Sequence, residues 1–334
     1  MMISVVYSDK FLEHDNFNHP ENSERLISIM RDLKKSEIFE KIKIVSPEPA
    51  DEEEILEIHS KEMVENVKRL SETGGWVDMD TYVCPGSYEI ARLAAGGVVM
   101  LASKVLSGEF AAGFALVRPP GHHATKNRSM GFCLINNVAL AAHIISRENK
   151  RVLIFDHDVH HGNGTQDIFY ESDRVMYQSF HLSPHYPGTG DIDEIGRGEG
   201  EGYTMNLPLP RGAGEKTIMD AMDEIFVPVA EQFKPDLIIV SSGFDSHYQD
   251  ALGGLRLSVE SFYRIIEKLR SVQPKIVCSL EGGYNLSKLG VLVLSEIYAM
   301  HGEGFNYGER VEELVYARDR IDELKKLLGE YWNL

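Results

Sequence analysis

Residues 152–164 read VLIFDHDVHHGNG, a short apolar run that leads directly into a cluster of acids and histidines. The run 152–155 is rich in β-branched and aromatic residues and shows little alternation, which is typical of a strand buried on both faces. In an extended segment Asp156, Asp158 and His160 would point to one side of the chain. Two carboxylates and an imidazole on one side have the composition of a divalent metal site, and turn or capping aspartates would not explain this alternation.

The same arrangement recurs along the chain, where apolar runs alternate with segments of helical periodicity. The apolar runs predict strands at 3–7, 42–45, 115–117, 152–155, 175–179, 237–240 and 276–280. Helical periodicity predicts helices at 23–34, 53–70, 87–106, 136–146, 215–232, 258–271 and 287–300. Alternating strands and helices indicate a single three-layer α/β domain over residues 1–334, with a mainly parallel sheet and helices on both faces. A charged segment of helical pattern, 309–331, would pack on its outside.

Composition narrows the class of protein. The 334 residues include 34 Lys+Arg and 52 Asp+Glu, so the formal net charge is −18, and 43% of the residues are hydrophobic. The hydrophobic content excludes a disordered chain. The negative charge argues against direct contact with nucleic acid, which needs a basic footprint, and is compatible with a cationic substrate.

Cysteine usage and the apolar stretches bear on the compartment. Cys84, Cys133 and Cys278 are scattered, which excludes a disulfide framework and suits a reducing compartment. We find no pattern of a signal peptide at the N-terminus, and the most apolar stretch, 93–106, is interrupted by glycines and polar residues. We therefore expect a cytoplasmic protein without a membrane partner.

Polar clusters follow other strands as well, where ligands bind in parallel α/β sheets. The 115–117 strand leads into Pro-Pro-Gly and the tandem pair His122 and His123, which we interpret as site residues. The 237–240 strand leads into Gly-Phe-Asp245, which could complete a metal site. The 276–280 strand leads into Glu-Gly-Gly-Tyr284, whose phenol could stabilise an oxyanion.

These groups together indicate a reaction. Asp158, His160 and Asp245 would supply three ligands and leave a fourth position for water or substrate, as in catalytic zinc sites. Such a metal lowers the pKa of water and polarises a carbonyl. A histidine pair that moves protons and a phenol that holds an oxyanion then predict hydrolysis of an amide bond.

With these segments assembled, the sequence resembles the histone deacetylase family of arginase-like α/β folds. The similarity covers residues 19–284 and rests on ordered motifs: His19-Pro20-Glu21, Asp80-Thr81-Tyr82, the 118–124 loop, Gly131-Phe132-Cys133, the 156–164 segment, Pro187-Gly188-Thr189-Gly190, Gly243-Phe244-Asp245 and Glu281-Gly282-Gly283-Tyr284. The resemblance implies one zinc ion on Asp158, His160 and Asp245, although the same ligands also accept Fe(II) or Co(II).

The resemblance also implies roles for the residues around the metal. His123 would be the general base and acid, with His122 as its electrostatic partner, hydrogen-bonded to Asp156. Asn163 would orient His123, and it stands where class I enzymes carry Asp, so the sequence is closer to class II and its bacterial and archaeal relatives. Tyr284 would hydrogen-bond the substrate carbonyl, which favours a working deacetylase.

Further positions match the substrate channel and structural cation sites of the family. Gly131, Phe132 and Tyr186 match the walls of a narrow tube for the acyl-lysine stem. Leu252 falls near the position where polyamine-specific relatives carry an acidic gatekeeper. Two potassium sites are implied, one by Asp156, Asp158, His160, Ser179 and Phe180, and a second by Phe169, Ser172, Val175 and Tyr203.

The sequence thus predicts a zinc-dependent amidohydrolase that removes acetyl or other acyl groups from acetyl-lysine side chains of peptides and proteins, or from related acylated amines. An acetylpolyamine amidohydrolase is an alternative. An arginase-type binuclear manganese ureohydrolase is another, but Ser246-His247 follows Asp245 without the second aspartate that two metals require. A module that has lost activity is opposed by the complete set of site residues.

Some features are set aside or stay open. We expect His157 and His161 to be packed, His247 to lie at the rim of the site, and His14, His59, His143 and His301 to have no converging partners. The oligomeric state stays open, including a homo-oligomer that uses segment 309–331.

Overall fold

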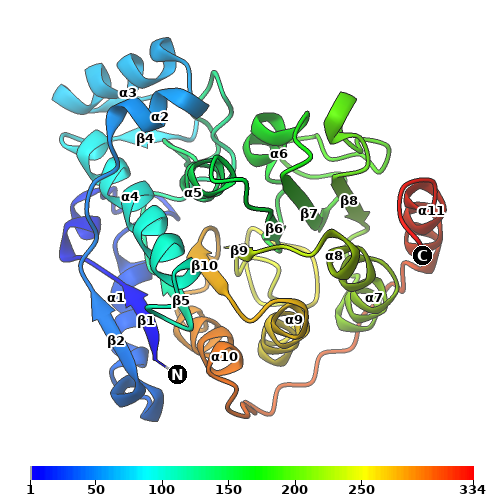
Figure 1. The fold of residues 1–334 in the computed structure, drawn as a ribbon. Coiled ribbons are helices and arrows are strands. Elements are labelled where there is room, and N and C mark those ends of the chain that lie inside the picture. Colours follow the sequence, from blue (N-terminus) through cyan, green and yellow to red (C-terminus); the bar gives the residue numbers. More distant parts are fainter. Residues whose placement is uncertain (1) are drawn as a thin grey trace.

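The computed structural model describes residues 2–334, and a parallel sheet runs through the centre of this part of the chain (Figure 1). Within these residues eight strands pair in the order β2-β1-β5-β10-β9-β6-β7-β8, and every pairing is parallel. The strands are β1 Ile3–Val6, β2 Ile42–Val45, β5 Ala112–Ala115, β6 Val152–Asp156, β7 Val175–Leu182, β8 Thr204–Leu209, β9 Leu237–Ser242 and β10 Ile276–Leu280. A separate antiparallel hairpin pairs β3 Gly75–Trp76 with β4 Tyr82–Val83. The α/β class with a parallel sheet is confirmed.

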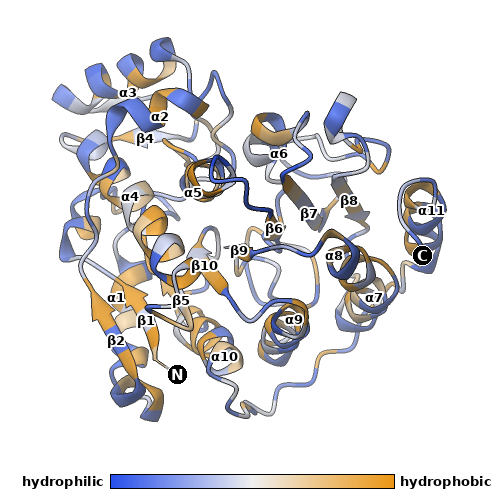
Figure 2. Cartoon of the chain, viewed as in Figure 1, coloured by the Kyte–Doolittle hydropathy of each residue, from blue (hydrophilic) through white to orange (hydrophobic). Residues whose placement is uncertain are grey.

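Helices cover both faces of the sheet, as predicted (Figure 1). One layer contains α1 Glu24–Leu33, α10 Leu289–His301, α9 Val259–Val272 and α8 Val227–Phe233, and α8 continues α7 Glu215–Ala221 through a π-helical turn at Met222–Phe226. The other layer contains α4 Ser87–Leu106, α5 Asn137–Ser146 and α6 Asn163–Phe169, with α2 Glu52–Ile58 and α3 Lys61–Thr73 outside them. Figure 2 shows hydrophobic colouring on β1 and β10, as expected for buried strands, and hydrophobic and hydrophilic colouring together on α9 and α11, as expected for helices at the surface of a core.

The C-terminal segment differs from the prediction. The chain has no regular structure between His301 and Arg318, and α11 Arg318–Leu328 is shorter than the predicted 309–331 helix. Its apolar residues Ile321, Leu324 and Leu328 are buried against β8 and α7 of the same chain. The apolar face of this helix is therefore covered without a second copy. Among residues 2–334, the helices are all too short or too polar to cross a membrane.

The predicted strand at 115–117 is displaced by two to three residues toward the C-terminus. The strand is Ala112–Ala115, and residues 116–117 already belong to the loop that leads to the histidines. A Cβ at Gly113 would lie 2.6 Å from Leu101 and 2.8 Å from the Ser4 carbonyl. Small residues are needed here because α4 and β1 pack closely on this strand, a requirement that local β-propensity does not show.

Other elements also differ from the prediction, and α6 and the β3–β4 hairpin were not predicted at all. Strand β8 was missed because Pro208 interrupts its apolar run, and proline is tolerated there because β8 is the last strand of the sheet. The predicted helix 53–70 is two helices, since α2 ends at Ile58 and the Ser60 side chain caps α3 by accepting the Met63 N–H.

The strand order explains why the polar motifs meet. The strands β5, β10, β9 and β6 are neighbours in the middle of the sheet, in that order. Because all are parallel, the loops that follow them leave at the same edge. These four loops carry His122 and His123, Tyr284, Asp245, and Asp158 with His160, respectively. The convergence of these residues follows from the topology.

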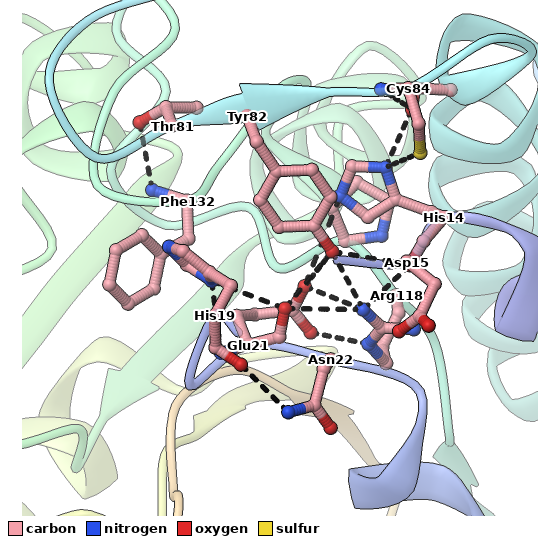
Figure 3. A network of polar contacts seen from close by, with 12 residues as sticks. His14, Asp15, His19, Glu21, Asn22, Thr81, Tyr82, Cys84, Arg118 and Phe132 are labelled. Atoms are coloured by element: carbon pink, nitrogen blue, oxygen red, sulfur yellow. Dashed lines mark hydrogen bonds and ion pairs between the residues drawn. The ribbon is translucent and has the colours of Figure 1, made fainter. Parts of the chain in front are cut away.

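A buried ion cluster ties the N-terminal segment to this edge (Figure 3). The carboxylate of Glu21 accepts hydrogen bonds from Arg118, including one from Nη2 at 2.8 Å, and from Arg25 Nη1 at 3.1 Å. All three side chains are fully buried. Burial raises the pKa of Glu21, but the two guanidinium groups outweigh burial and lower that pKa to about 2. His14 belongs to the same cluster, so the expectation that it has no partner is wrong.

Glu21→Gln should destabilise the protein strongly. A neutral amide would leave two buried guanidinium groups without a counter-charge, and the free energy of unfolding should fall by about 3 kcal/mol. Urea unfolding followed by circular dichroism measures this change. Glu89→Gln is the matched control, because Glu89 pairs with Arg92 at the surface, and its effect should stay below about 1 kcal/mol. Similar small effects for both variants would contradict the assigned importance of the cluster.

Candidate active site

A cavity of about 200 Å³ opens at the carboxyl edge of the central strands. Its lining includes every channel residue and most of the catalytic residues that the sequence singled out. The lining residues are Asp80, Pro120, His122, His123, Gly131, Phe132, Asp158, His160, His185, Tyr186, Leu252, Gly282 and Tyr284.

Three of the predicted metal ligands form a compact cluster beside this cavity. The donor atoms of Asp158, His160 and Asp245 all lie within 4.8 Å of one another. Strand β6 ends at Asp156, so Asp158 and His160 are placed by a loop and not by the extended segment that the alternation suggested. Asp156 consequently lies outside the cluster. Its carboxylate accepts from His122 Nδ1 at 3.1 Å.

The contacts of the cluster fit a bound divalent cation. One oxygen of Asp245 accepts the Val159 N–H at 2.9 Å, whereas the buried Oδ2 accepts no hydrogen bond of good geometry among residues 2–334 and lies 3.3 Å from His160 Nδ1. The Asp158 carboxylate accepts the N–H groups of Gly282 and His160, both at 2.9 Å. Two buried carboxylates that converge on one imidazole carry more negative charge than that ring can offset, which favours a bound cation. Three such ligands leave coordination positions for water and substrate.

The two adjacent histidines differ in protonation. Burial lowers the pKa of His122, but the charges of Asp156 and Asp158 outweigh it and raise that pKa to about 10. Burial and the neighbouring His122 and His160 hold the pKa of His123 well below its usual value near 6.5. His123 is therefore neutral at physiological pH beside a cationic His122. Such divergence between neighbouring titratable groups is typical of acid–base sites.

The hydrogen bond of His123 leaves one ring nitrogen available. His123 Nδ1 lies 2.7 Å from the Asn163 side-chain oxygen and donates its hydrogen to it. In the neutral ring Nε2 is then the acceptor. Asn163 thus holds His123 in the tautomer that a general base requires.

Tyr284 is held by a loop that side chains anchor on two sides. Arg25 donates to the carbonyl oxygens of Glu281 and Gly283, and its guanidinium lies 5.1 Å from the centre of the Tyr284 ring. The Glu281 carboxylate accepts the main-chain N–H groups of Gly121 and His122 at 2.7 and 3.1 Å, and so connects the Tyr284 loop to the histidine loop. Burial raises the pKa of Tyr284 well above 10, so its phenol keeps the hydrogen that it can donate.

Aromatic rings form the walls of the cavity. Phe132 meets Tyr284 edge to face at 5.9 Å, and Tyr186 meets His123 in the same way at 5.1 Å. Phe132 has φ +69°, and its N–H donates to Thr81 Oγ1 at 3.1 Å. Gly131 has φ +56°, and a Cβ there would lie 2.4 Å from the His123 ring. Glycine is thus required where the chain passes beside the His123 ring.

Other histidines lie away from the cavity or were overlooked. His157 and His161 are packed, as predicted, with His157 Nε2 2.9 Å from Glu296 and His161 hydrogen-bonded to Thr189. His247 does not line the rim; it is buried and pairs with Glu309 at 2.9 Å. His185 was not singled out, although it lines the cavity and stacks on His160 at 4.8 Å.

Sequence reasoning also missed two carboxylates near the cavity. Asp80 lines it, although the sequence only indicated Asp80 as part of a motif. Asp250 contacts the main chain of two lining residues and carried no sequence signal beyond its place in the loop after Asp245. For His185 and Asp80 the sequence did offer a signal. His185 precedes the channel residue Tyr186, and Asp80 precedes Thr81 in a motif, so both could have been placed at the cavity.

Comparison with known proteins identifies the group to which the chain belongs. The family model described as Histone deacetylase domain matches residues 19–300. The chain belongs to the histone deacetylase family. It is similar to a protein named Probable deacetylase from Archaeoglobus fulgidus, with 38% identity over 99% of both chains, and to one of the same name from Methanothermobacter thermautotrophicus, with 40% identity over 90% of this chain and 91% of that one. The crystal structure of the HDA15 HD domain matches with a TM-score of 0.93 and 34% identity, over 99% of this chain and 96% of that chain.

Membership supports a hydrolase of the deacetylase type, and the geometry shows how such a family member arranges its site. Asp158 and His160 of the ligand cluster, the neutral imidazole of His123 and the phenol of Tyr284 line one cavity with aromatic walls. The family is metal-dependent in general, which agrees with the unpartnered oxygen of Asp245.

Gly282→Ala should weaken the affinity for a divalent cation at least about tenfold, because displacing ligands by an ångström or so removes optimal coordination. A Cβ at this position would lie 2.2 Å from Asp245 Oδ2 and 2.6 Å from Asp158 Oδ2. Isothermal titration of metal-depleted protein measures the affinity. In the control Gly304→Ala the added Cβ meets no atom within 4 Å, and the affinity should not change. An unchanged affinity in Gly282→Ala would show that the two carboxylates do not hold the cation.

Proposed function

We propose that this chain is a zinc-dependent amidohydrolase that removes acetyl groups from acetyl-lysine side chains or related acylated amines. One observation carries the proposal: neutral His123, the Tyr284 phenol and the ligands Asp158 and His160 line the same cavity, and Asp245 completes the ligand cluster beside it. These groups supply the base, the oxyanion donor and the cation site that amide hydrolysis needs.

The residues of the chain divide the reaction between them. A zinc ion, when bound, would lower the pKa of water and polarise the acyl carbonyl. His123 Nε2 takes the proton of the attacking water and then gives it to the leaving amine. The cationic His122, paired with Asp156, favours the neutral form of His123 at rest. Tyr284 donates its O–H to the carbonyl oxygen, which gains negative charge in the transition state.

The shape of the cavity supports an acylated alkylamine as the substrate. Phe132 and Tyr186 present aromatic surface to the cavity, which suits a chain of methylenes. The net charge of −18 would attract a substrate with cationic flanking groups. Leu252 places an apolar side chain in the lining, near the position where polyamine-specific relatives carry an acidic gatekeeper. This favours acetyl-lysine peptides over acetylated polyamines.

A binuclear ureohydrolase is not favoured by the contacts of the residues that follow Asp245. Ser246 Oγ donates to the His157 carbonyl at 2.8 Å, and His247 pairs with Glu309. Both side chains are therefore engaged elsewhere, and neither supplies a ligand for a second metal beside the cluster.

The proposal includes structural potassium ions. Asp156 and Ser179 are neighbours in the register of β6 and β7, and the first site would also use Asp158 and the main-chain oxygens of His160, Ser179 and Phe180. The second site would use the residues at the α6–β7 connection and the start of β8, namely Phe169, Ser172, Val175 and Tyr203.

Acetyl-lysine peptides should be hydrolysed faster than acetylated polyamines, by protein that contains one zinc ion per chain. Mass spectrometry of acetate release, with metal analysis of the same sample purified without added metal, measures both properties. In His123→Ala the metal content should stay the same and turnover should be lost, because the variant lacks the base and keeps every ligand. Urea release with two manganese ions per chain would replace the proposal by the ureohydrolase alternative.

Tyr284→Phe should lower kcat by about a hundredfold or more and change KM little, because an oxyanion donor acts mainly in the transition state. Steady-state kinetics with an acetyl-lysine peptide measures both constants. Tyr186→Phe is the control, since it removes a phenol oxygen from the wall of the same cavity. Its kcat should stay within about threefold of wild type, because this phenol has no assigned part in the reaction. Wild-type kcat in Tyr284→Phe would refute the assigned role of the phenol.

A further inference from the structure

The loop after Asp245 contains a carboxylate that the reaction described above does not use. Asp250 accepts three main-chain hydrogen bonds: Oδ1 accepts from Leu252 N at 2.9 Å, and Oδ2 accepts from Tyr284 N at 2.7 Å and Asn285 N at 3.1 Å. One side chain thus binds the main chain of two loops, one after β9 and one after β10.

These hydrogen bonds reach both walls of the cavity. Leu252 and Tyr284 line it, and neither belongs to a helix or strand whose ladder would hold its main chain. The Leu252 carbonyl is held independently, because His185 Nε2 donates to it at 3.0 Å. The N–H of Tyr284 depends on Asp250. Without that acceptor, the N–H would be unsatisfied at a half-buried position.

A carboxylate is the group that this position requires. Burial and the charge of Asp245 raise the pKa of Asp250 to about 6, so a negative charge here is costly, and the three N–H donors offset that cost. An asparagine of the same size has a single acceptor oxygen. Its NH₂ group would face either the Leu252 N–H or the N–H groups of Tyr284 and Asn285.

We propose that Asp250 is a positioning residue of the active site, which holds the main chain of Tyr284 so that the phenol reaches the acyl carbonyl. The inference rests on the proposed function, in which the Tyr284 O–H donates to that carbonyl. Arg25 restrains the same loop through the carbonyls of Glu281 and Gly283, so Asp250 and Arg25 hold it from its N–H side and its carbonyl side. A shift of about 1 Å in a catalytic group can cost about a hundredfold in rate, which makes such restraint consequential.

A double-mutant cycle tests whether Asp250 acts through Tyr284. Asp250→Asn, Tyr284→Phe and the double variant are compared by kcat and KM on an acetyl-lysine peptide, with thermal stability and zinc content measured on each. We expect Asp250→Asn to lower kcat at least about tenfold and to change KM less than about threefold. In the Tyr284→Phe background the same substitution should lower kcat less than about twofold, because the interaction it disrupts no longer contributes.

Two further variants separate positioning from folding. Asp250→Ser removes the carboxylate without placing an NH₂ group against the main chain, and it should show the same dependence on Tyr284 if Asp250→Asn does not fold. Gln249→Ala is the matched control, since this neighbouring side chain is exposed and its kcat should equal that of wild type.

The outcomes distinguish the inference from the proposed function. If Tyr284→Phe keeps wild-type kcat, the proposed function fails, because the phenol is then not the oxyanion donor. If Tyr284→Phe is impaired and the loss of the Asp250 carboxylate lowers kcat by the same factor in both backgrounds, Asp250 does not act through Tyr284 and the inference is overturned. Wild-type kcat in Asp250→Asn and Asp250→Ser would also overturn it.

Discussion

The carboxyl ends of β5, β10, β9 and β6 bring ionisable side chains into a region from which water is largely excluded, and each charge there needs a partner. Glu21 forms ion pairs with Arg25 and Arg118, and Asp156 pairs with His122. Asp245 keeps one oxygen without a hydrogen-bond partner among the described residues, which fits a cation. The strand order brings these loops to one edge, and pairing of the buried charges holds their side chains in place there.

Carboxylates also hold the main chain of the loops that carry the reacting groups. Glu281 accepts two N–H groups of the histidine loop, Asp250 accepts the N–H of Tyr284, and Asp158 accepts that of Gly282. Loops lack the hydrogen-bond ladder of helices and strands, so side chains must supply these acceptors. The result is a set of reacting groups on irregular segments that nonetheless have fixed positions.

The sequence predicted the parts that depend on short segments. The apolar runs located β2 and β10 correctly, and the residues that follow the strands predicted which side chains would gather, because parallel strands end at one edge. Strand β5 was misplaced because its small residues are set by the close packing of α4, which local sequence does not show. Strand β8 was missed because Pro208 breaks its apolar run, and proline is tolerated there only because β8 is the last strand of the sheet. Asp250 gave little signal because it holds main-chain atoms of a distant segment, and His185 was overlooked because its stacking on His160 exists only in the folded chain.

The sequence by itself determined the α/β class, the motif residues and the net charge of −18, since these follow from local periodicity and composition. Only the tertiary structure decided that His123 is neutral beside a cationic His122, and that one carboxylate holds both Leu252 and Tyr284. These properties arise from burial and from distances between segments far apart in the chain. Neither quantity exists until the sheet has brought its strand ends together.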